Sequence, residues 1–455
     1  MTSSVLTNGH QGLGLQSLHV KLAMLVTAIL CAALFTSVAL INVSVLLLLL
    51  LAPWAWLHHH RSGQSLAPHS AGFLVAVVLF CAWDVFTNVY AGHSLQASLK
   101  MLSRDLRPLA FVPILWALFA NPRLARFALW ALLVCAILLA ALNLVLTLTG
   151  QVQQGQYFTK GLTHLSHLYG QALVGLVFVL AQVFLLKPRW RWWAGTSIAV
   201  LILSLLLASE RRTGWLLLAA GFVVWALLNA KRLFVGKYKW WVVVAFLVAL
   251  LAAFFSDIFN ARMALAWKEY NHFVSLSPQE RAVTAFGSVS LRLQYVVTVL
   301  EAIEQSNWWV GVGSIDLAKA YQAAATSLGV GPATWDTFNW RNPHNEYLFM
   351  WATKGLVGLG LYLSIFVLAC RAAWFKQDEV QRVSLLVFVF LFMLSITANS
   401  MVIDMPEGHL TMLVLLIFLA PKHLGFLDPH GHSDALAETA QGLMGMPAMP
   451  KGKSV

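Results

Sequence analysis

The sequence is poor in charged residues. Only 11% of its 455 residues are Asp, Glu, Lys or Arg, whereas a typical soluble domain carries about 25%. Hydrophobic residues make up 59% of the chain, and its mean hydropathy is +0.74. A chain of this composition has too few polar side chains to cover a water-soluble surface. Its long apolar runs instead predict an all-α, polytopic integral membrane protein.

Cysteine is also scarce, and acidic residues are outnumbered. The four cysteines lie inside apolar runs at spacings that indicate neither a disulfide nor a metal site. The 18 acidic residues face 30 basic ones, which gives a net charge of +12. The basic residues fall in short loops between apolar runs, so we expect them to set the orientation of the chain in a membrane and not to bind nucleic acid.

Twelve apolar runs are long enough, or nearly so, to cross a bilayer as helices. They are residues 19–38, 41–57, 70–90, 106–120, 124–149, 168–187, 192–209, 213–229, 239–256, 345–370, 383–400 and 408–421.

Basic residues predict the orientation of these spans. With the N-terminus in the cytoplasm, every inward loop carries Lys or Arg. Two outward groups break this pattern, and they are Lys100, Arg104 and Arg107 after the third run and Arg211-Arg212 after the seventh. For the first group we expect an amphipathic segment at the membrane interface that contacts anionic headgroups.

The spans divide the chain into four parts. Residues 1–256 hold the first nine spans with short loops, and residues 345–421 hold the last three. Residues 257–344 form one long segment, which we expect on the outer side of the membrane. Residues 422–455 form a polar tail, expected to be cytoplasmic and disordered.

The long outer segment carries helical spacing over residues 260–273 and 289–306. The tract 308–313, Trp-Trp-Val-Gly-Val-Gly, predicts a turn after the second of these helices. The segment is rich in tryptophan, which favours an ordered cap at the membrane surface. These tryptophans are Trp267, Trp308, Trp309, Trp335 and Trp340.

A polar cluster opens the tenth span, in residues 341–348 (Arg-Asn-Pro-His-Asn-Glu-Tyr-Leu). Such residues are costly at the mouth of a membrane helix, and the cost indicates a function. Asn342 and Pro343 are typical of a helix cap and first turn, with Glu346 near the positive helix end. These helix-start signals leave His344 unexplained. His344 could be a general base, since its ordinary pKa near 6.5 lets it accept a proton at neutral pH, and Glu346 is the alternative base.

Arginines on the outer side could bind a phosphate or pyrophosphate. Arg211 and Arg212 open a predicted helix, Arg292 lies in the long segment, and Arg341 lies just before the tenth span. A guanidinium group offers bidentate donors, and a helix N-terminus adds partial positive charge. For Arg211, snorkelling or pairing with Glu210 explains the residue equally well.

The main charge predicted inside a span is Asp84, which should face the interior of the bundle, although the sequence names no partner for it. No cluster of acidic or histidine residues accompanies the outer polar residues. We therefore expect neither a metal nor a cofactor.

The motif His344-Asn345-Glu346-Tyr347-Leu348, followed by Gly355 and Gly358, resembles that of the O-antigen ligase and polymerase superfamily. So does the long outer segment ahead of it, with an arginine, a helix and a Gly-Val-Gly turn. The specific resemblance lies in residues 209–215 and 287–360. It implies a fold similar to the metal-independent, type C membrane glycosyltransferases, in the bacterial inner membrane with the active site facing the periplasm.

The resemblance also implies a reaction. The enzyme would move O-antigen polysaccharide from undecaprenyl pyrophosphate to a sugar hydroxyl of lipid A-core, with inversion at the anomeric carbon. The family's first arginine, in a Ser-Arg-small-small-Trp pattern, maps onto Arg212, and Arg211 stands where the serine usually is. Which of these two binds phosphate stays open. The second arginine maps onto Arg292 and the histidine onto His344.

These residues would then have separate roles. Arg212 and Arg292 would stabilise the pyrophosphate leaving group, with Arg341 or Arg211 assisting, and His344 would deprotonate the acceptor. The remaining polar residues of the motif would support the site. They are Asn345, Glu346 and Tyr347.

Three alternatives remain. An O-antigen polymerase or a protein O-oligosaccharyltransferase would use the same carrier with another acceptor. A lipid or polysaccharide transporter should show paired discontinuous helices and charges in the middle of several spans, whereas here the polar residues cluster at one face. We therefore favour an enzyme that works as a monomer, with the carrier-linked glycan, lipid A-core and membrane lipids as partners.

Overall fold

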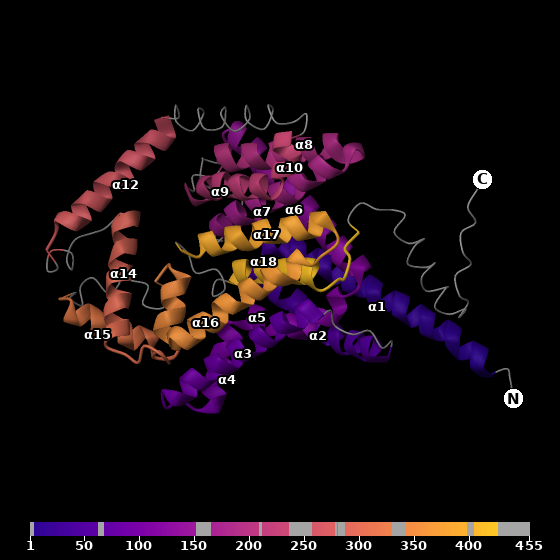
Figure 1. Cartoon of the computed structure of the whole chain (residues 1–455), viewed down its shortest axis with the longest axis horizontal. Coiled ribbons are helices and arrows are strands. Elements are labelled where there is room, and N and C mark those ends of the chain that lie inside the picture. Colours follow the sequence, from indigo (N-terminus) through magenta and orange to yellow (C-terminus); the bar gives the residue numbers. More distant parts are fainter. Residues whose placement is uncertain are drawn as a thin grey trace.

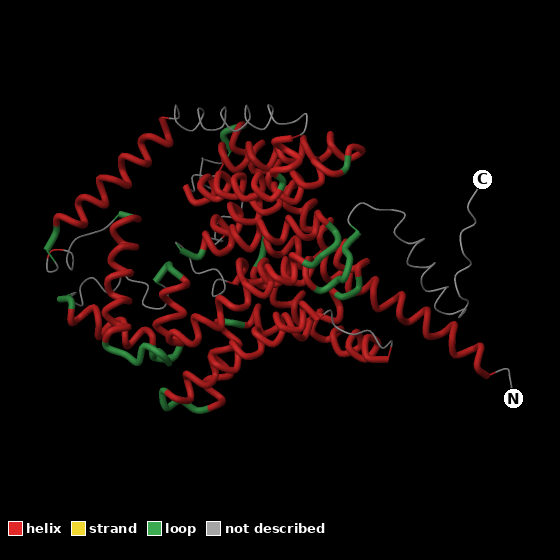
Figure 2. The backbone as a smooth tube through the Cα atoms, viewed as in Figure 1, coloured by secondary structure: helices red, strands yellow, loops and turns green. Residues whose placement is uncertain are grey.

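The structure is a computed structural model, and every regular element in its described part is a helix (Figure 2). The described residues are 4–61, 68–151, 165–208, 212–235, 257–277, 280, 287–329, 343–397 and 405–425.

The first half of the chain forms a series of helices. They are α1 (Ser4–Leu34), α2 (Val38–Arg61), α3 (Pro68–Tyr90), α4 (Leu95–Asp105), α5 (Arg107–Phe119), α6 (Pro122–Leu148), α7 (Leu165–Leu186), η1 (Pro188–Trp190), α8 (Arg191–Leu203), η2 (Ser204–Ala208), α9 (Arg212–Leu228) and α10 (Ala230–Val235). The second half contributes α12 (Asp257–Ser275), α14 (Ser288–Glu304), α15 (Leu317–Ser327), α16 (Glu346–Trp374), α17 (Glu379–Ser395) and α18 (Met405–Leu419).

The chain is a polytopic membrane protein, as its composition predicts. Five helices of the described part are long and apolar enough to cross a membrane. They are Val38–His60, Ser70–Tyr90, Pro122–Leu148, Pro188–Leu207 and Glu346–Trp374. The ninth predicted span, 239–256, lies outside the described residues. The other predicted spans all fall on helices, several of them shorter, so a total of twelve crossings stays a prediction.

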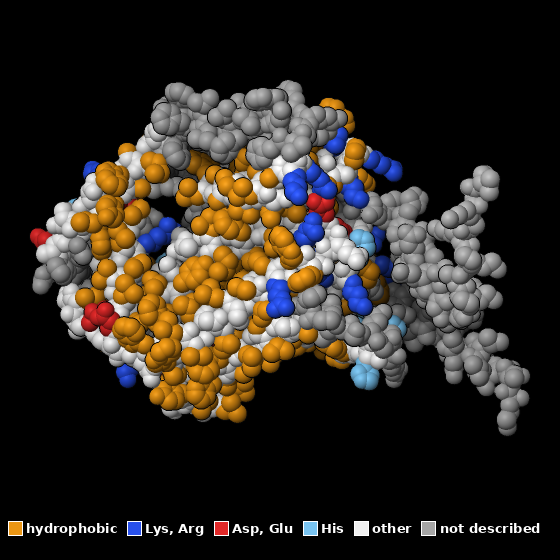
Figure 3. Space-filling model, in the orientation of Figure 1, with side chains coloured by type: hydrophobic (Ala, Val, Ile, Leu, Met, Phe, Trp, Pro, Cys, Tyr) orange, Lys and Arg blue, Asp and Glu red, His pale blue; other side chains and the backbone are white. Residues whose placement is uncertain are grey.

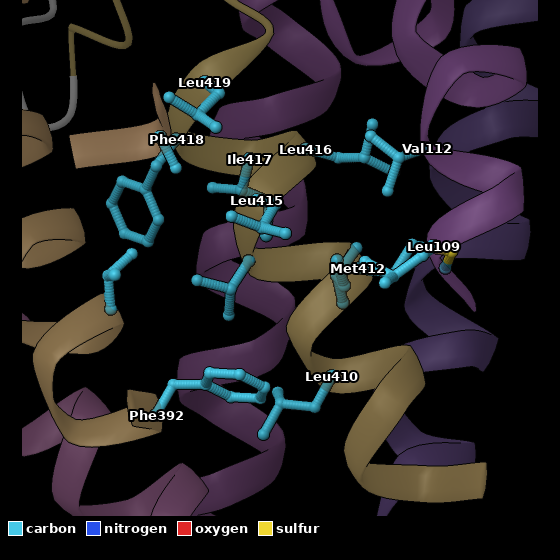
Figure 4. Packing of buried hydrophobic residues seen from close by; sticks show 14 of the residues in the cluster. Leu109, Val112, Phe392, Leu410, Met412, Leu415, Leu416, Ile417, Phe418 and Leu419 are labelled. Atoms are coloured by element: carbon cyan, nitrogen blue, oxygen red, sulfur yellow. The ribbon is translucent and has the colours of Figure 1, made fainter. Parts of the chain in front are cut away.

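The core of the bundle surrounds α18. Its residues from Leu410 to Leu419 are buried on every side, which an apolar helix achieves only when other helices enclose it. Figure 4 shows Leu416 and Met412 packed against Val112 and Leu109 of α5, while Phe392 of α17 lies on the other side. The long helix α16 packs on α3 and on α17.

The helices of the predicted outer segment lie at one end of the bundle. Figure 1 shows α12, α14 and α15 at this end, with the start of α1 at the other. Many Lys and Arg side chains gather toward the end of the bundle opposite α12, α14 and α15 (Figure 3), as the predicted orientation requires. The predicted helices over 260–273 and 289–306 are confirmed as α12 and α14.

The basic group after the third span lies in and beside α4, a short amphipathic helix with Leu95 and Leu99 exposed. Arg104 pairs with Asp105 at 2.7 Å, and Arg107 donates to the side-chain oxygen of Asn42 at 3.0 Å. Two of the three basic residues therefore have partners within the protein, and contact with lipid headgroups stays a prediction.

Candidate functional site

His344 lies at a sharp turn immediately before α16. Its backbone φ is +52°, and among the described residues it alone has a positive φ without being glycine. Such a conformation is unfavourable for a residue with a Cβ and often marks a functional position. The helix begins at Glu346, and its cap is Asn345, whose side chain accepts from the N–H of Leu348 at 3.0 Å.

The prediction that Pro343 forms the first turn is therefore wrong. Pro343 is buried ahead of the helix, and His344 turns the chain between them, because a left-handed residue cannot be part of a right-handed helix. Asn342, the predicted cap, lies outside the described residues. The turn places the half-buried His344 side chain just before the start of α16, so His344 is not part of the helix.

Two residues of α14 face His344. The rings of Tyr295 and His344 have centroids 5.5 Å apart and planes inclined at 46°. Burial, and then the positive charge of Arg292, lower the pKa of His344 from its ordinary value near 6.5. A lowered pKa keeps the imidazole neutral at neutral pH, which is the form that accepts a proton. The structure thus brings two of the predicted site residues, His344 and Arg292, together.

Helix α12 holds the start of α14, and so the position of Arg292. The carboxylate of Glu269 accepts from the N–H of Val289 at 2.8 Å, and the Glu269 carbonyl accepts from the Ser290 hydroxyl at 2.9 Å. A Cβ on Gly287, the cap residue, would lie 2.3 Å from the Glu269 carboxylate. A protein carboxylate thus occupies this helix N-terminus, so any ligand at Arg292 would rely on the guanidinium and not on the helix end.

Glu346 and Tyr347 face the protein interior and not the turn. The Glu346 side chain is fully buried and accepts from the Tyr362 hydroxyl at 3.0 Å. The Tyr347 hydroxyl donates to the carbonyl of Met393 at 2.7 Å. The Glu346 contact lies within α16, and the Tyr347 contact ties α16 to α17. Both suit the predicted supporting role, and the burial of Glu346 makes it the weaker candidate for a base.

Arg212 begins α9, directly after a π-helical turn, η2. Such turns are frequent at functional sites. The indole of Trp215 donates to the carbonyl of Leu205 in that turn at 3.4 Å, so the tryptophan of the Arg212 motif ties the start of α9 to η2. Gly214, in the first turn of α9, is buried.

Arg212 lies at the same end of the bundle as His344. Arg232, just beyond α9, pairs with Glu379 at the start of α17 at 2.7 Å, so the packed helices α9 and α17 run antiparallel. The start of α9 therefore lies at the end of α17, where the Ile396 carbonyl accepts from the N–H of Glu346 at 2.9 Å. The other two predicted arginines, Arg211 and Arg341, lie outside the described residues.

Helix α16 is broken at Gly355, whose φ of +65° and ψ of −174° are open only to glycine. Residues 308–313, here called the crossing segment, lie over the break. The N–H groups of Val312 and Gly313 donate to the carbonyls of Ala352 and Thr353, each at 2.9 Å. On the far side of the break, the N–H of Leu356 donates to the carbonyl of Trp308 at 2.8 Å. The predicted turn at 308–313 is confirmed, but its pairing with α16 was not predicted.

A buried ion pair adjoins the break, and it supplies the partner that the sequence did not name. Lys354 Nζ lies 2.5 Å from Asp84 Oδ1 on α3 and donates to the Ser314 hydroxyl at 2.7 Å. The Ser314 hydroxyl in turn donates to Asp84 at 3.1 Å. The interior position of Asp84 is confirmed, since only 1% of it is exposed. Lys354 was missed because it stands in the motif region as a single lysine with no distinguishing spacing.

No group of three or more His, Cys, Asp or Glu side chains that could hold a metal occurs in the part of the chain that the structure describes.

The comparisons with known proteins bear on residues 197–363. A model of the family described as O-Antigen ligase matches this stretch. The match contains the start of α9, all of α14, His344 and the break in α16. No curated protein matches the chain.

Proposed function

Residues 197–363 belong to the O-antigen ligase family, and from that premise we propose that the protein is an O-antigen ligase. It would move O-antigen polysaccharide from undecaprenyl pyrophosphate to a sugar hydroxyl of lipid A-core. The reaction would take place at the periplasmic face of the bacterial inner membrane, without a metal, in a fold of the type C glycosyltransferase kind. The observation that carries this proposal is the position of His344 at a strained turn against α14, where its ring contacts Tyr295 and its pKa is lowered by burial and by the charge of Arg292.

In the proposed reaction His344 acts first, as a general base. Its neutral imidazole removes the proton from the acceptor hydroxyl, and the oxygen attacks the anomeric carbon of the donor glycan. A new glycosidic bond forms while the bond from that carbon to the pyrophosphate oxygen breaks, and the electron pair leaves with the pyrophosphate. One displacement of this kind inverts the anomeric centre. The support from this chain is the lowered pKa of His344, which favours the form able to take a proton.

Arginines would stabilise the leaving group. Negative charge develops on the bridging oxygen as the bond breaks, and a fixed guanidinium nearby stabilises that charge more in the transition state than in the bound donor. Arg292 is the best-supported candidate because α12 holds the start of its helix, α14, which contacts His344 through Tyr295. Arg212 would join it from the start of α9, with Arg211 or Arg341 assisting.

The experiment uses purified full-length protein with a chelator present. Carrier-linked glycan is offered with lipid A-core in one reaction and with glycan alone in another. We expect glycosylated lipid A-core and free undecaprenyl pyrophosphate. Extension of the glycan alone would mean a polymerase, and loss of activity in chelator would contradict the metal-independent mechanism. Absence of any product from an inserted, folded protein would favour a transporter.

A further inference from the structure

We propose that three buried residues, Asp84, Ser314 and Lys354, position His344 relative to Arg292 although they touch neither residue. We call them the Lys354 cluster. The positioning role deepens the proposed function, and it rests on that function only where a rate of glycan transfer is measured. The cluster joins α3, the residue directly after the crossing segment and the broken helix α16 at one point.

Burial of this cluster is not explained by stability alone. Lys354 is 0%, Asp84 1% and Ser314 5% exposed. Removing two charges from water is costly, and a buried ion pair often stabilises a fold no better than well-packed apolar residues would. What such a pair does supply, in the best-attested cases, is the selection of one arrangement of helices over others. The arrangement selected here is that of the two halves of α16.

The break leaves the angle of the first half of α16 open to adjustment. Residues 346–354 form this half, and Gly355 interrupts the helix directly after Lys354. Backbone hydrogen bonds from the crossing segment satisfy the groups at the break, and the Trp83 indole donates to the Lys354 carbonyl at 2.9 Å. The ion pair then adds the side-chain contact between Lys354, at the end of this half, and α3.

Both candidate site residues lie on elements that this cluster fixes. His344 comes two residues before the first half of α16, and α14, which carries Arg292, ends at Glu304 shortly before the crossing segment. The two helices also pack on each other. Lys354 lies about 12 Å along the helix axis from Glu346, at about 1.5 Å per residue, so it acts through the helix and not by contact. It is a positioning residue and not a catalytic one.

The experiment replaces both charges at once. The double variant Asp84→Leu/Lys354→Met, as full-length purified protein, removes the ion pair without leaving one charge buried alone. The pKa of His344 is measured by NMR of ring-labelled histidine, with its signal identified by its loss in His344→Gln. Glycan transfer is measured on the same preparations.

We expect the pKa of His344 to rise toward its ordinary value near 6.5, because the turn becomes more exposed and Arg292 moves away. We expect kcat to fall by about tenfold to 100-fold with little change in KM, since a displacement of about 1 Å at a reacting group can cost this much. The control is Arg232→Met/Glu379→Leu, which removes an ion pair at the opposite end of α17 and should change neither quantity.

An unchanged His344 titration in a folded double variant would overturn the positioning role. If the apolar pair does not fold, Asp84→Asn/Lys354→Gln replaces it, because amides can keep a hydrogen bond after both charges are lost, and the same criterion applies. A changed titration with an unchanged kcat would support the positioning role but contradict His344 as the base. Failure of the proposed function is thereby distinguished from failure of this inference.

Discussion

Tyr295 and His344 lie against each other across 49 residues of sequence, one inside α14 and the other at the turn before α16, with ring centroids 5.5 Å apart. Tyr295 is only 2% exposed, so the packing around it holds its ring in place, and the half-buried His344 packs against that ring. This contact limits the rotation of an imidazole whose backbone is already held at a positive φ. A base that is held in one orientation loses less entropy when the acceptor hydroxyl arrives.

The Tyr295 contact predicts a difference between two substitutions. Tyr295→Phe keeps the ring and should retain most of the transfer activity. Tyr295→Leu removes the aromatic ring but keeps a sizeable apolar side chain. We expect kcat to fall by about tenfold, which is the kind of loss that a small misplacement of a reacting group causes. Steady-state kinetics with carrier-linked glycan would measure both. Equal activity of the two variants would show that the ring does not orient His344.

The proposed roles predict that His344→Ala, Arg212→Ala and Arg292→Ala each abolish transfer while the protein still inserts. General-base catalysis contributes about 10²–10⁴-fold, and one stabilising donor for a developing charge about 10²–10³-fold. Product formation on lipid A-core is the measurement. The matched control is Arg104→Ala, because Arg104 pairs with Asp105 outside the site and should remain near wild-type activity. Normal lipopolysaccharide from cells with only His344→Ala would remove His344 from the mechanism.

The lowered pKa of His344 predicts how transfer depends on pH. The base works unprotonated, so the rate should fall as the pH drops through the pKa of His344, at a value below its ordinary 6.5. Arg292 and Tyr295 face the imidazole from α14, and Glu346 follows it in sequence. Because the charge of Arg292 disfavours a second positive charge, residual activity of Arg292→Gln should have its acid limb at higher pH. A limb that moves to lower pH would contradict this assignment.

Sequence patterns predicted the helices well and the tertiary contacts poorly. The apolar runs were sufficient for the helices of the bundle, because a chain in a membrane must satisfy its backbone groups within each segment. The helical spacing over 289–306 was sufficient for α14 in the outer segment. The interior position of Asp84 also followed from the sequence, because exposing a charged side chain to lipid costs free energy. Its partner Lys354 lies 270 residues away, and no local pattern links the two. Only the packing of α16 on α3 brings them together.

The start of α16 shows a different limit. Asn342 and Pro343 carry the ordinary signals of a helix start, yet the helix begins at Glu346 with Asn345 as its cap. The signals were overridden because His344 adopts a left-handed conformation, which the surrounding contacts impose and the sequence does not encode locally. A conflict between local signal and structure is expected where function constrains the backbone. The glycines at 311 and 355 similarly depend on a neighbour far along the chain.

The Asn345 cap predicts a graded effect on stability. Its side-chain oxygen caps α16, and its Nδ2 donates to the carbonyl of Thr397 at 3.0 Å beyond the end of α17. Asn345→Ala loses both contacts and should lower the free energy of unfolding by about 1 kcal/mol or more. Asn345→Asp keeps the cap and loses only the donor, so its thermal midpoint should lie between wild type and Asn345→Ala. Equal midpoints for the two variants would mean that the contact to Thr397 dominates, because both variants lose it.

Glycine is required at position 355 but not at 360, although both lie on α16. A Cβ at Gly355 would lie 2.1 Å from the carbonyl carbon of Trp309, and the residue also has a positive φ that favours glycine. A Cβ at Gly360 would meet nothing within 4 Å. Gly355→Ala should therefore displace the crossing segment from the break, lowering both thermal stability and transfer. Gly360→Ala should leave transfer unchanged and stabilise the helix slightly, by up to about 1 kcal/mol.

These two alanine variants are matched in chemistry and helix, so a general effect of added bulk cannot explain a difference between them. Hydrogen exchange of the Val312 and Gly313 amides locates the cause, since these amides bond to Ala352 and Thr353 next to the break. Faster exchange there in Gly355→Ala, with α18 still protected, would show that the crossing segment has separated while the core remains folded. Protection equal to wild type at both amides would show that α16 accommodates a Cβ at the break. The close approach of the two backbones would then not be what fixes glycine at position 355.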